Sequence, residues 1–367
     1  MNDATDRVAG AGADPPAGRK AGGFTGLWPR ALERLLRLSP DETRVATRGF
    51  EVESQKVIER LEGIGASFAH GYNSALCSAS LDELMKVLDQ FEPADAGFAF
   101  EGAAMGLALA DWMTPGRRRF EAFVAGPALA HEYMAWVGLG WSFARLPVSP
   151  VRALRRYRSI NKWLALDGYG FHEGYFGWRQ SVSRQRRPRS LAGSTARVFD
   201  QGLGRSLWFV CGASPAAVAR TVEAFAQDRH GDLWSGIGLA ATYAGGVDRA
   251  GLGALREAAA GHVPALGQGV VFAAQARLRA GNPVPHAVLA CREILGLDLP
   301  DAAALATRHL PSEGDDIESF QRWRFAIQAG CDRSGLSPTD ATESAAGYSA
   351  GRGGDRAAEL PGRPALL

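Results

Sequence analysis

The sequence contains none of the short motifs that accompany common enzyme chemistries. It has no Gly-x-Ser-x-Gly nucleophile elbow, no phosphate-binding P-loop, no His-Glu-x-x-His metal motif and no dinucleotide fingerprint. Its four cysteines have no metal-ligand spacing, which favours reduced thiols in a cytoplasmic protein. We therefore expect no cofactor and no metal site, and any catalytic chemistry must come from ordinary side chains.

Long apolar runs and an excess of one charge are also missing. No window reaches the roughly 18 uncharged apolar residues that a membrane-spanning helix requires. The best candidate, residues 97–113, contains Glu101 and Asp111 and is predicted to be a buried helix. Residues 1–23 lack the apolar core of a signal peptide. With a net charge of +2, nucleic acid is not an expected partner.

Helical signals dominate what remains, and period-2 alternation is scarce, so the fold class is predicted to be mostly α. Ser80 and Glu83 form a capping box that predicts a helix over residues 81–92. Ser149 followed by Pro150 predicts a helix that continues to about residue 166. Three closing helices are expected over residues 284–297, 301–309 and 317–329.

An internal repeat is suggested by two similar caps. Cys77-Ser-Ala-Ser80 matches Cys211-Gly-Ala-Ser214, and the same offset aligns Gly102 with Gly236. We interpret this as two helical halves that pack about a pseudo-twofold axis, where ligand clefts often lie. The predicted organisation is a flexible N-terminal segment with a short amphipathic helix over 27–38, two repeats and a disordered tail: residues 1–42, 43–170, 171–330 and 331–367.

The stretch 167–178 concentrates unusual chemistry near the seam between these halves. It carries four glycines, five aromatic residues and the ionisable trio Asp167, His172 and Glu173. Carboxylate and imidazole are the usual proton-handling groups, so this stretch is a candidate active-site wall. A tightly packed junction between repeats is the alternative, since glycine often serves backbone geometry alone.

Carboxylates within apolar helices are the second chemical signal. Glu101 and Asp111 lie in the apolar run described above, and burial raises the pKa of a carboxyl so that it can act as an acid. The alternative is that they pair with arginine or cap a turn. The candidate catalytic residues are Asp167, Asp111, His172, Glu173 and Glu101.

Aromatic and basic side chains supply candidate binding residues. Aromatic faces suit cations and unsaturated chains, although core packing explains many of them. Residues 152–197 hold eleven lysines and arginines against two carboxylates, which suits a diphosphate, an acidic partner or an anionic membrane, or else a solvated face. We expect this region and the helix at 27–38 to serve docking. The candidate substrate-binding residues are Arg205, Trp208, Trp234, Tyr169, Phe171, Trp178, Arg155 and Arg156.

Several longer motifs resemble one family. Arg48-Gly-Phe50, Phe98-Ala-Phe-Glu-Gly-Ala-Ala104, Gly202-x-Gly-Arg-Ser-Leu-Trp-Phe209 and Asp232-Leu-Trp-x-Gly-x-Gly-Leu-Ala240 are similar to the domain-of-unknown-function family 1702, over about residues 43–330. Its members include UnbL-like proteins of bacterial enediyne gene clusters. The resemblance implies bacterial specialised metabolism around a long polyene, but it implies no reaction and no active site.

Two functions follow as hypotheses. The first is a cytoplasmic enzyme that cyclises or remodels a long apolar unsaturated chain, either a polyene or a polyprenyl substrate. Its basic segments would allow it to associate with the membrane surface. A buried acid would protonate an alkene while aromatic side chains stabilise the cation. The second is a non-catalytic subunit that binds the polyene or scaffolds a complex at the membrane. Turnover by the purified protein, with and without its cluster partners, separates them.

Overall fold

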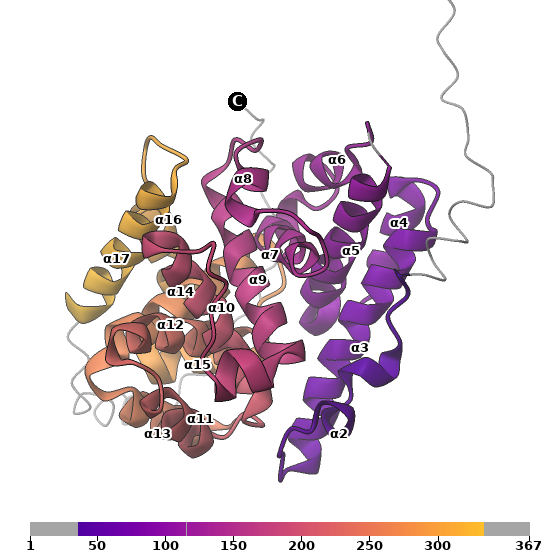
Figure 1. Cartoon of the computed structure of the whole chain (residues 1–367). Coiled ribbons are helices and arrows are strands. Elements are labelled where there is room, and N and C mark those ends of the chain that lie inside the picture. Colours follow the sequence, from indigo (N-terminus) through magenta and orange to yellow (C-terminus); the bar gives the residue numbers. More distant parts are fainter. Residues whose placement is uncertain (1–35, 115, 334–367) are drawn as a thin grey trace, which may run out of the picture.

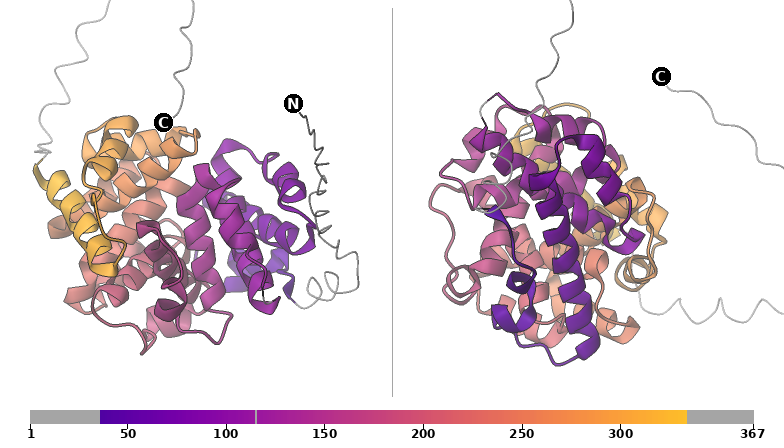
Figure 2. Two further views of the ribbon diagram at one scale, coloured as in Figure 1. Left: turned by 90° about the horizontal axis from the view of Figure 1, so that it is seen from above. Right: turned by 90° about the vertical axis from the view of Figure 1, so that its right-hand side faces the viewer.

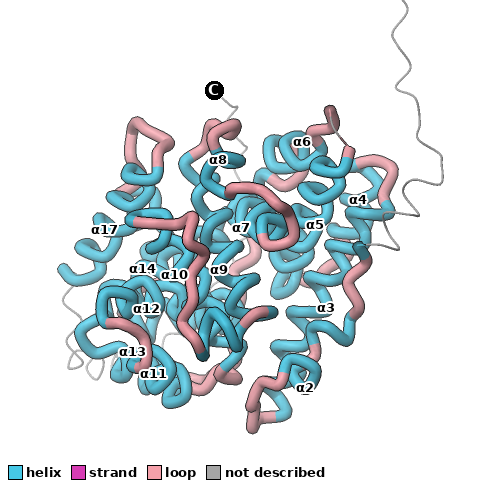
Figure 3. The backbone as a smooth tube through the Cα atoms, in the orientation of Figure 1, coloured by secondary structure: helices cyan, strands magenta, loops and turns pink. Residues whose placement is uncertain are grey.

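The computed structural model describes residues 36–114 and 116–333, and these are helical with no β-strand among them (Figure 3). The fold class is therefore mostly α, as predicted. No helix within the described ranges is long and apolar enough to cross a lipid bilayer. Most of the predicted amphipathic helix at 27–38 and of both predicted tails lies outside these ranges, although residues 331–333 belong to the last helix.

Long helices follow one another across the molecule in chain order (Figure 1). Each packs against the next from the indigo end to the orange end, and the view from above shows the same succession (Figure 2). The long helices are α3 (Gln55–Cys77), α5 (Pro93–Met113), α7 (Glu132–Phe143), α9 (Leu164–Phe176), α10 (Gly193–Val210), α12 (Gln227–Ala244), α14 (Val263–Arg279) and α17 (Ile317–Arg333).

Shorter helices lie between the long ones and return the chain. From α10 to α14 the neighbouring long helices run parallel: Arg229 of α12 meets Asp200 near the start of α10, and Trp208 near its end meets Gly245 just after α12. Parallel neighbours require such return segments. The shorter helices are α2 (Val45–Arg48), α4 (Leu81–Leu88), α6 (Arg119–Ala125), α8 (Pro150–Leu154), α11 (Pro215–Glu223), α13 (Arg249–Ala259), α15 (Pro285–Ala290) and α16 (Leu299–Arg308).

Glycine pairs set how closely the long helices approach. Two residues separated by one other lie roughly 200° apart around a helix, hence on opposite faces. A Cβ at Gly168 would lie 1.9 Å from the carbonyl oxygen of Val137 in α7, and one at Gly170 would lie 2.0 Å from that of Phe199 in α10. Backbone thus touches backbone on both sides of α9. Equivalent Gly-x-Gly pairs occur in α7, α10 and α12: Gly138/Gly140, Gly202/Gly204 and Gly236/Gly238. In α14, Gly269 faces the backbone of α12, whereas Gly267 faces the side chains of Leu295 and Cys331.

The later long helices α12 and α14 also contact the first two, α3 and α5. Arg277 of α14 donates hydrogen bonds of 3.0 Å to the carbonyl oxygens of Pro93 and Ala94 at the start of α5. Arg60 of α3 donates to the carbonyl oxygen of Ala244 at 2.8 Å. These contacts close the molecule around a buried centre.

The sequence predicted some helix ends correctly and others wrongly. Ser80 caps α4, as predicted, because its Oγ accepts from the Glu83 backbone N–H at 3.1 Å, but the helix ends at Leu88. The single helix predicted from residue 150 to 166 is wrong. The chain leaves α8 after Leu154, and the Ser159 hydroxyl caps a new turn that leads into α9.

The predicted division at residues 170/171 falls inside α9, whose glycines join its two neighbours. The stretch 167–178 is thus largely helix. The two superposable halves and their pseudo-twofold axis stay a prediction. Glycines that face the backbone of the preceding long helix include Gly102, Gly138, Gly168, Gly202 and Gly236. They follow one another at intervals of roughly 30–36 residues, a length typical of helical-repeat units. Four such intervals make up the offset between the matched caps.

Candidate functional site

Arg205 of α10 lies at the centre of the molecule and is buried. Its Nη1 donates to Asp167 Oδ1 of α9 at 2.5 Å, and its guanidinium carbon lies 5.0 Å from the centre of the Phe171 ring. Asp167 is fully buried, and its second oxygen accepts from Gln201 Nε2 at 2.7 Å. Three predicted residues, Asp167, Phe171 and Arg205, therefore meet.

A polar chain continues from this pair across the next two helices. Ser235 Oγ of α12 lies 3.0 Å from Gln201 Oε1 and 2.6 Å from the amide of Gln268 in α14. A hydroxyl donates only one hydrogen bond, and the buried Gln268 Nε2 otherwise has no partner. The Gln268 amide is therefore best oriented with Nε2 donating to Ser235. Each of these side chains hydrogen-bonds another member of the chain, which is typical of a structural network.

Glu101 of α5 is the buried acid nearest to this centre. Its Oε1 accepts from the Trp141 indole N–H at 2.8 Å and lies 3.8 Å from Arg205 Nη2. Burial raises the pKa of the Glu101 carboxyl to about 7, since it destabilises the charged form, while Arg205 and the indole oppose the shift. Close to neutral pH, Glu101 therefore holds a proton that it can transfer.

A small aromatic cavity of about 30 Å³ adjoins Glu101. This is room for about one water molecule. Glu101 and Arg205 are its charged lining residues, whereas Asp167, His172, Glu173 and Trp208 do not line it. Of the stretch 167–178, the candidate active-site wall, the aromatic residues Phe171, Tyr175 and Phe176 thus line this cavity, and its ionisable residues do not. Its aromatic lining consists of Phe68, Phe98, Trp141, Phe171, Tyr175, Phe176 and Phe209.

A larger groove, of about 420 Å³, lies on the other side of three of these aromatic residues. Phe68, Trp141 and Phe176 line both spaces and form the partition between them. The volume is that of a small-molecule site. The groove wall comes from α3, α5, α7 and α9, together with the chain just before α2, and most of its lining residues have apolar side chains. Its charged lining residues are Arg37, Glu42 and Arg145.

His172 and Glu173 lie beside this groove. His172 Nε2 accepts from Arg145 Nε at 3.2 Å, and His172 Nδ1 lies 3.4 Å from Glu173 Oε1. Burial lowers the pKa of His172, which keeps the ring neutral at pH 7. The His172 ring also contacts Trp141 edge to face, with centroids 5.7 Å apart. His172 therefore holds an arginine and contacts the partition, Glu173 lies beside His172, and neither residue lines either space.

Asp111 belongs to a different region. Its Oδ2 accepts from the Phe120 backbone N–H at 2.9 Å, and burial raises the pKa of its carboxyl. It lines a separate hollow that includes Arg156 and Tyr157. The structure does not place Asp111 beside Glu101 and Arg205. The two predicted acids of α5 therefore lie in different environments.

The remaining predicted binding residues are dispersed. Trp208 is fully buried and donates to the carbonyl oxygen of Gly245, and Trp234 is buried in α12. Trp178 donates to the carbonyl oxygen of Arg48, and Tyr169 packs edge to face on Phe199. Arg156 pairs with Glu121, whereas Arg155 lines an open surface hollow with Arg152.

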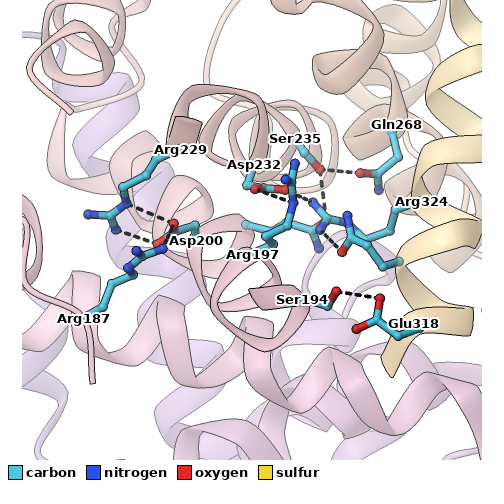
Figure 4. A network of polar contacts seen from close by, with 12 residues as sticks. Arg187, Ser194, Arg197, Asp200, Arg229, Asp232, Ser235, Gln268, Glu318 and Arg324 are labelled. Carbon is cyan, nitrogen blue, oxygen red and sulfur yellow. Dashed lines mark hydrogen bonds and ion pairs between the residues drawn. The ribbon is translucent and has the colours of Figure 1, made fainter. Parts of the chain in front are cut away.

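Two further buried carboxylates are enclosed by arginines (Figure 4). Asp200 accepts from Arg229 and Arg187, and Asp232 pairs with Arg324 and Arg197. Part of the predicted basic docking region therefore neutralises internal acids. Neither aspartate lines the aromatic cavity. In the described part of the chain, no three His, Cys, Asp or Glu side chains gather as metal ligands.

Sequence reasoning missed Gln201, Trp141 as a site residue, and Arg145. Gln201 precedes Arg205 by one helical turn, so both lie on one face of α10. This spacing is visible in the sequence. Trp141 and Glu101 are 40 residues apart, and Arg145 and His172 are 27 apart. Only the packing of α5, α7 and α9 brings those groups together.

Comparison with known proteins gives one family. The family model described as protein of unknown function (DUF1702) matches residues 27–331, so the chain belongs to that family. No curated protein and no solved structure matches the chain.

Proposed function

We propose that this member of the DUF1702 family is an enzyme that protonates an unsaturated apolar chain, with Glu101 as the acid. The observation that carries the proposal is the position of Glu101. Its carboxyl, with a pKa of about 7, borders an aromatic cavity that is separated from a surface groove by three aromatic side chains. A general acid works best when its pKa lies near the operating pH.

The lining of the two spaces supports an apolar substrate. Met105, Leu109 and Leu146 of the groove offer a surface suited to hydrocarbon, and the cavity beyond is lined mainly by aromatic rings. The cavity itself is too small for a substrate. The chain must therefore displace the partition of Phe68, Trp141 and Phe176 to bring a double bond to Glu101. Rotation of side chains at a groove wall is a common response to a ligand.

The proposed chemistry balances without an oxidant or a cofactor. The Glu101 proton adds to one alkene carbon, the π electrons form the new C–H bond, and the other carbon becomes cationic. Phe68, Trp141 and Phe171 present ring faces that stabilise the cation. Attack by a second double bond then forms a C–C bond. Loss of a neighbouring proton to the Glu101 carboxylate completes a cyclisation, or, without the C–C bond, an isomerisation.

The substrate class follows from the groove and from the family context expected from the sequence. A long polyene or polyprenyl chain of bacterial specialised metabolism is the expected occupant of a groove with mainly apolar side chains that an aromatic partition separates from a proton donor. The proposed location is the cytoplasm, at the membrane surface when the chain is delivered from lipid.

The Glu101→Gln variant tests the acid. Glutamine preserves the shape and can still accept from the Trp141 indole, but it has no transferable proton. We expect turnover of a polyene substrate to fall by about 10²–10⁴-fold, with binding to the groove retained. Because the acid must be protonated, turnover by the unaltered protein should decline as pH rises through about 7. Product analysis with a panel of polyenes over pH 5.5–8.5 measures both effects.

Glu132→Gln is the matched control. Glu132 also accepts from an indole, that of Trp136 at 3.2 Å, but it lines neither the cavity nor the groove. Its substitution should leave turnover unchanged. Full turnover by Glu101→Gln, or loss of turnover by both variants, would show that Glu101 is not the acid.

A second candidate is a non-catalytic subunit that binds the polyene for another enzyme. The observation that favours it is the set of partners around Glu101, since Trp141 and Arg205 also suit a purely structural carboxyl. The exposed Arg152 and Arg155 hollow would then face a partner protein. Polyene binding without turnover, both alone and with the cluster partners added, is the result that selects this function.

A further inference from the structure

Arg145 is held in a defined orientation at the groove. It follows the end of α7 and comes four residues after Trp141 of the partition. Its Nε donates to His172 Nε2 at 3.2 Å, and its guanidinium carbon lies 5.5 Å from the centre of the Phe176 ring. Anchoring through Nε leaves the two terminal nitrogens as a fork, and Arg145 lines the groove.

His172 accepts a hydrogen bond from Arg145 through its Nε2. A neutral imidazole carries one N–H, and an arginine Nε–H can only donate, so the His172 proton resides on Nδ1 and Nε2 keeps its lone pair. Glu173 Oε1 lies 3.4 Å from His172 Nδ1 and favours this tautomer through its charge, without forming a hydrogen bond to it. His172 therefore supports an arginine that follows the end of α7.

The charge at this place has no internal partner in the described ranges. Arg145 forms no ion pair with a carboxylate there, although Arg187, Arg197 and Arg205 each do. Arg37 and Glu42 are the other charged side chains that line this groove. An oriented guanidinium fork beside apolar surface matches the planar shape of a carboxylate joined to a hydrocarbon.

We propose that the groove selects an apolar chain that ends in a carboxylate, that Arg145 binds this carboxylate, and that His172 and Glu173 position Arg145. This deepens the proposed function, on which it rests, by naming the substrate class as an unsaturated carboxylic acid. With the carboxylate on Arg145, the first carbons of the chain lie against Trp141 and Phe176, which line both the groove and the cavity of Glu101. The double bonds near the acid end are then those that reach the proton donor.

Binding of a fluorescent conjugated octadecatetraenoic acid to the full chain, compared with its methyl ester, tests this assignment. The two probes share the hydrocarbon but differ in charge. We expect the acid to bind at least roughly tenfold more tightly, since a hydrogen bond between charged groups contributes about 1.5–3 kcal/mol. Arg145→Gln should bind both probes with the affinity that the unaltered protein has for the ester. Arg145→Lys should recover only part of the preference, because lysine lacks the fork.

The positioning role of His172 has its own readout. His172→Phe removes the acceptor and should reduce the preference for the acid without weakening ester binding. His172→Gln, which restores an acceptor oxygen, should recover part of it. Arg155→Gln, at an exposed arginine that lines another hollow, is the matched control and should change neither affinity.

The outcomes separate this inference from the function on which it rests. Equal affinity for acid and ester in the unaltered protein, or an acid preference that survives Arg145→Gln, overturns the carboxylate site and leaves Glu101 as the proposed acid. Failure of both probes to bind at all overturns the carboxylate site and the apolar groove together. Circular dichroism of each variant identifies any that does not fold. If Arg145→Gln does not fold, the test of the carboxylate site relies on Arg145→Lys, which keeps the charge.

Discussion

Two carboxyl groups near Arg205 illustrate how a residue's partners determine its role. Asp167 contacts Arg205 and Gln201 and is sealed from the cavity, whereas Glu101 borders the cavity and lies farther from the guanidinium. The sequence placed both on the list of acids and could not rank them. Asp167 has the surroundings of a structural counter-ion, and Glu101 has those of a proton donor.

Replacement of Asp167 should therefore affect stability first. Asp167→Asn removes the charge that balances buried Arg205, and breaking such a pair costs about 3–5 kcal/mol of unfolding free energy. This expectation differs from the catalytic role that the sequence suggested for Asp167. Chemical denaturation followed by circular dichroism measures the loss.

Asp298→Asn is the control, since Asp298 pairs with Arg292 at the surface, where such pairs contribute about 0–1 kcal/mol. An unfolding free energy for Asp167→Asn that equals that of the unaltered protein would contradict the role of Asp167 as a counter-ion.

The helices of this protein meet through backbone rather than through interlocking side chains. Gly202 of α10 faces the Asp167 carbonyl oxygen of α9, and Gly204 faces that of Leu233 in α12. Because such contacts lie directly beside Asp167 and Arg205, the spacing of the helices also fixes the geometry of the buried polar centre.

A methyl group at one of these glycines should force two helices apart. A Cβ at Gly202 would lie 1.8 Å from the Asp167 carbonyl oxygen, and backbone cannot rotate away as a side chain can. We expect Gly202→Ala to lower the unfolding free energy by about 1–3 kcal/mol, the usual cost of overpacking. Thermal and chemical denaturation measure the change.

Gly63→Ala in α3 is the matched control, because a Cβ there has no atom within 4 Å. Replacing a helical glycine with alanine where space permits should raise stability by about 0.5–1 kcal/mol. The packing account fails if the two substitutions have the same effect.

The elements were more predictable than their contacts. The cap at Ser80 and the buried helix around Glu101 depend on neighbours in sequence, and both were read correctly. The break after Leu154 was missed because Ser159 caps a turn within a pattern that looked continuous. The bond from Trp141 to Glu101 joins two helices, and no local periodicity reports such a contact. The Gly-x-Gly pairs are visible in the sequence. Their role in helix contacts can be recognised only once the order of helix packing is known.

The molecule as a whole is closed by arginines that bind carbonyl oxygens. Arg277 is fully buried, donates to Pro93, Ala94 and Tyr243, and stacks over the Tyr243 ring at 3.8 Å. It therefore joins α14, α12 and the first turn of α5. The contact holds the late helices against the early ones and keeps the centre sealed.

Arg277→Met should weaken this closure. The substitution keeps apolar volume but removes the three hydrogen bonds from the guanidinium to the carbonyl oxygens of Pro93, Ala94 and Tyr243, and a hydrogen bond to a charged group contributes about 1.5–3 kcal/mol. We expect a loss of at least about 3 kcal/mol and faster hydrogen exchange in the first turn of α5. Arg279→Met, two residues on and paired with partly exposed Glu132, should cost about 1 kcal/mol or less. Equal losses for the two variants would show that Arg277 is not the closing contact.

This closing contact also bears on the order in which helix contacts form during translation. Each long helix meets its predecessor soon after synthesis, because the two are neighbours along the chain. The bond from Arg277 to Pro93 joins positions 184 apart and must wait until α14 has been made. The groove, whose walls belong to the first four long helices and the segment before them, is complete before then. If the groove binds the proposed apolar chain, we expect a nascent protein to be able to bind it while the later helices are still being translated.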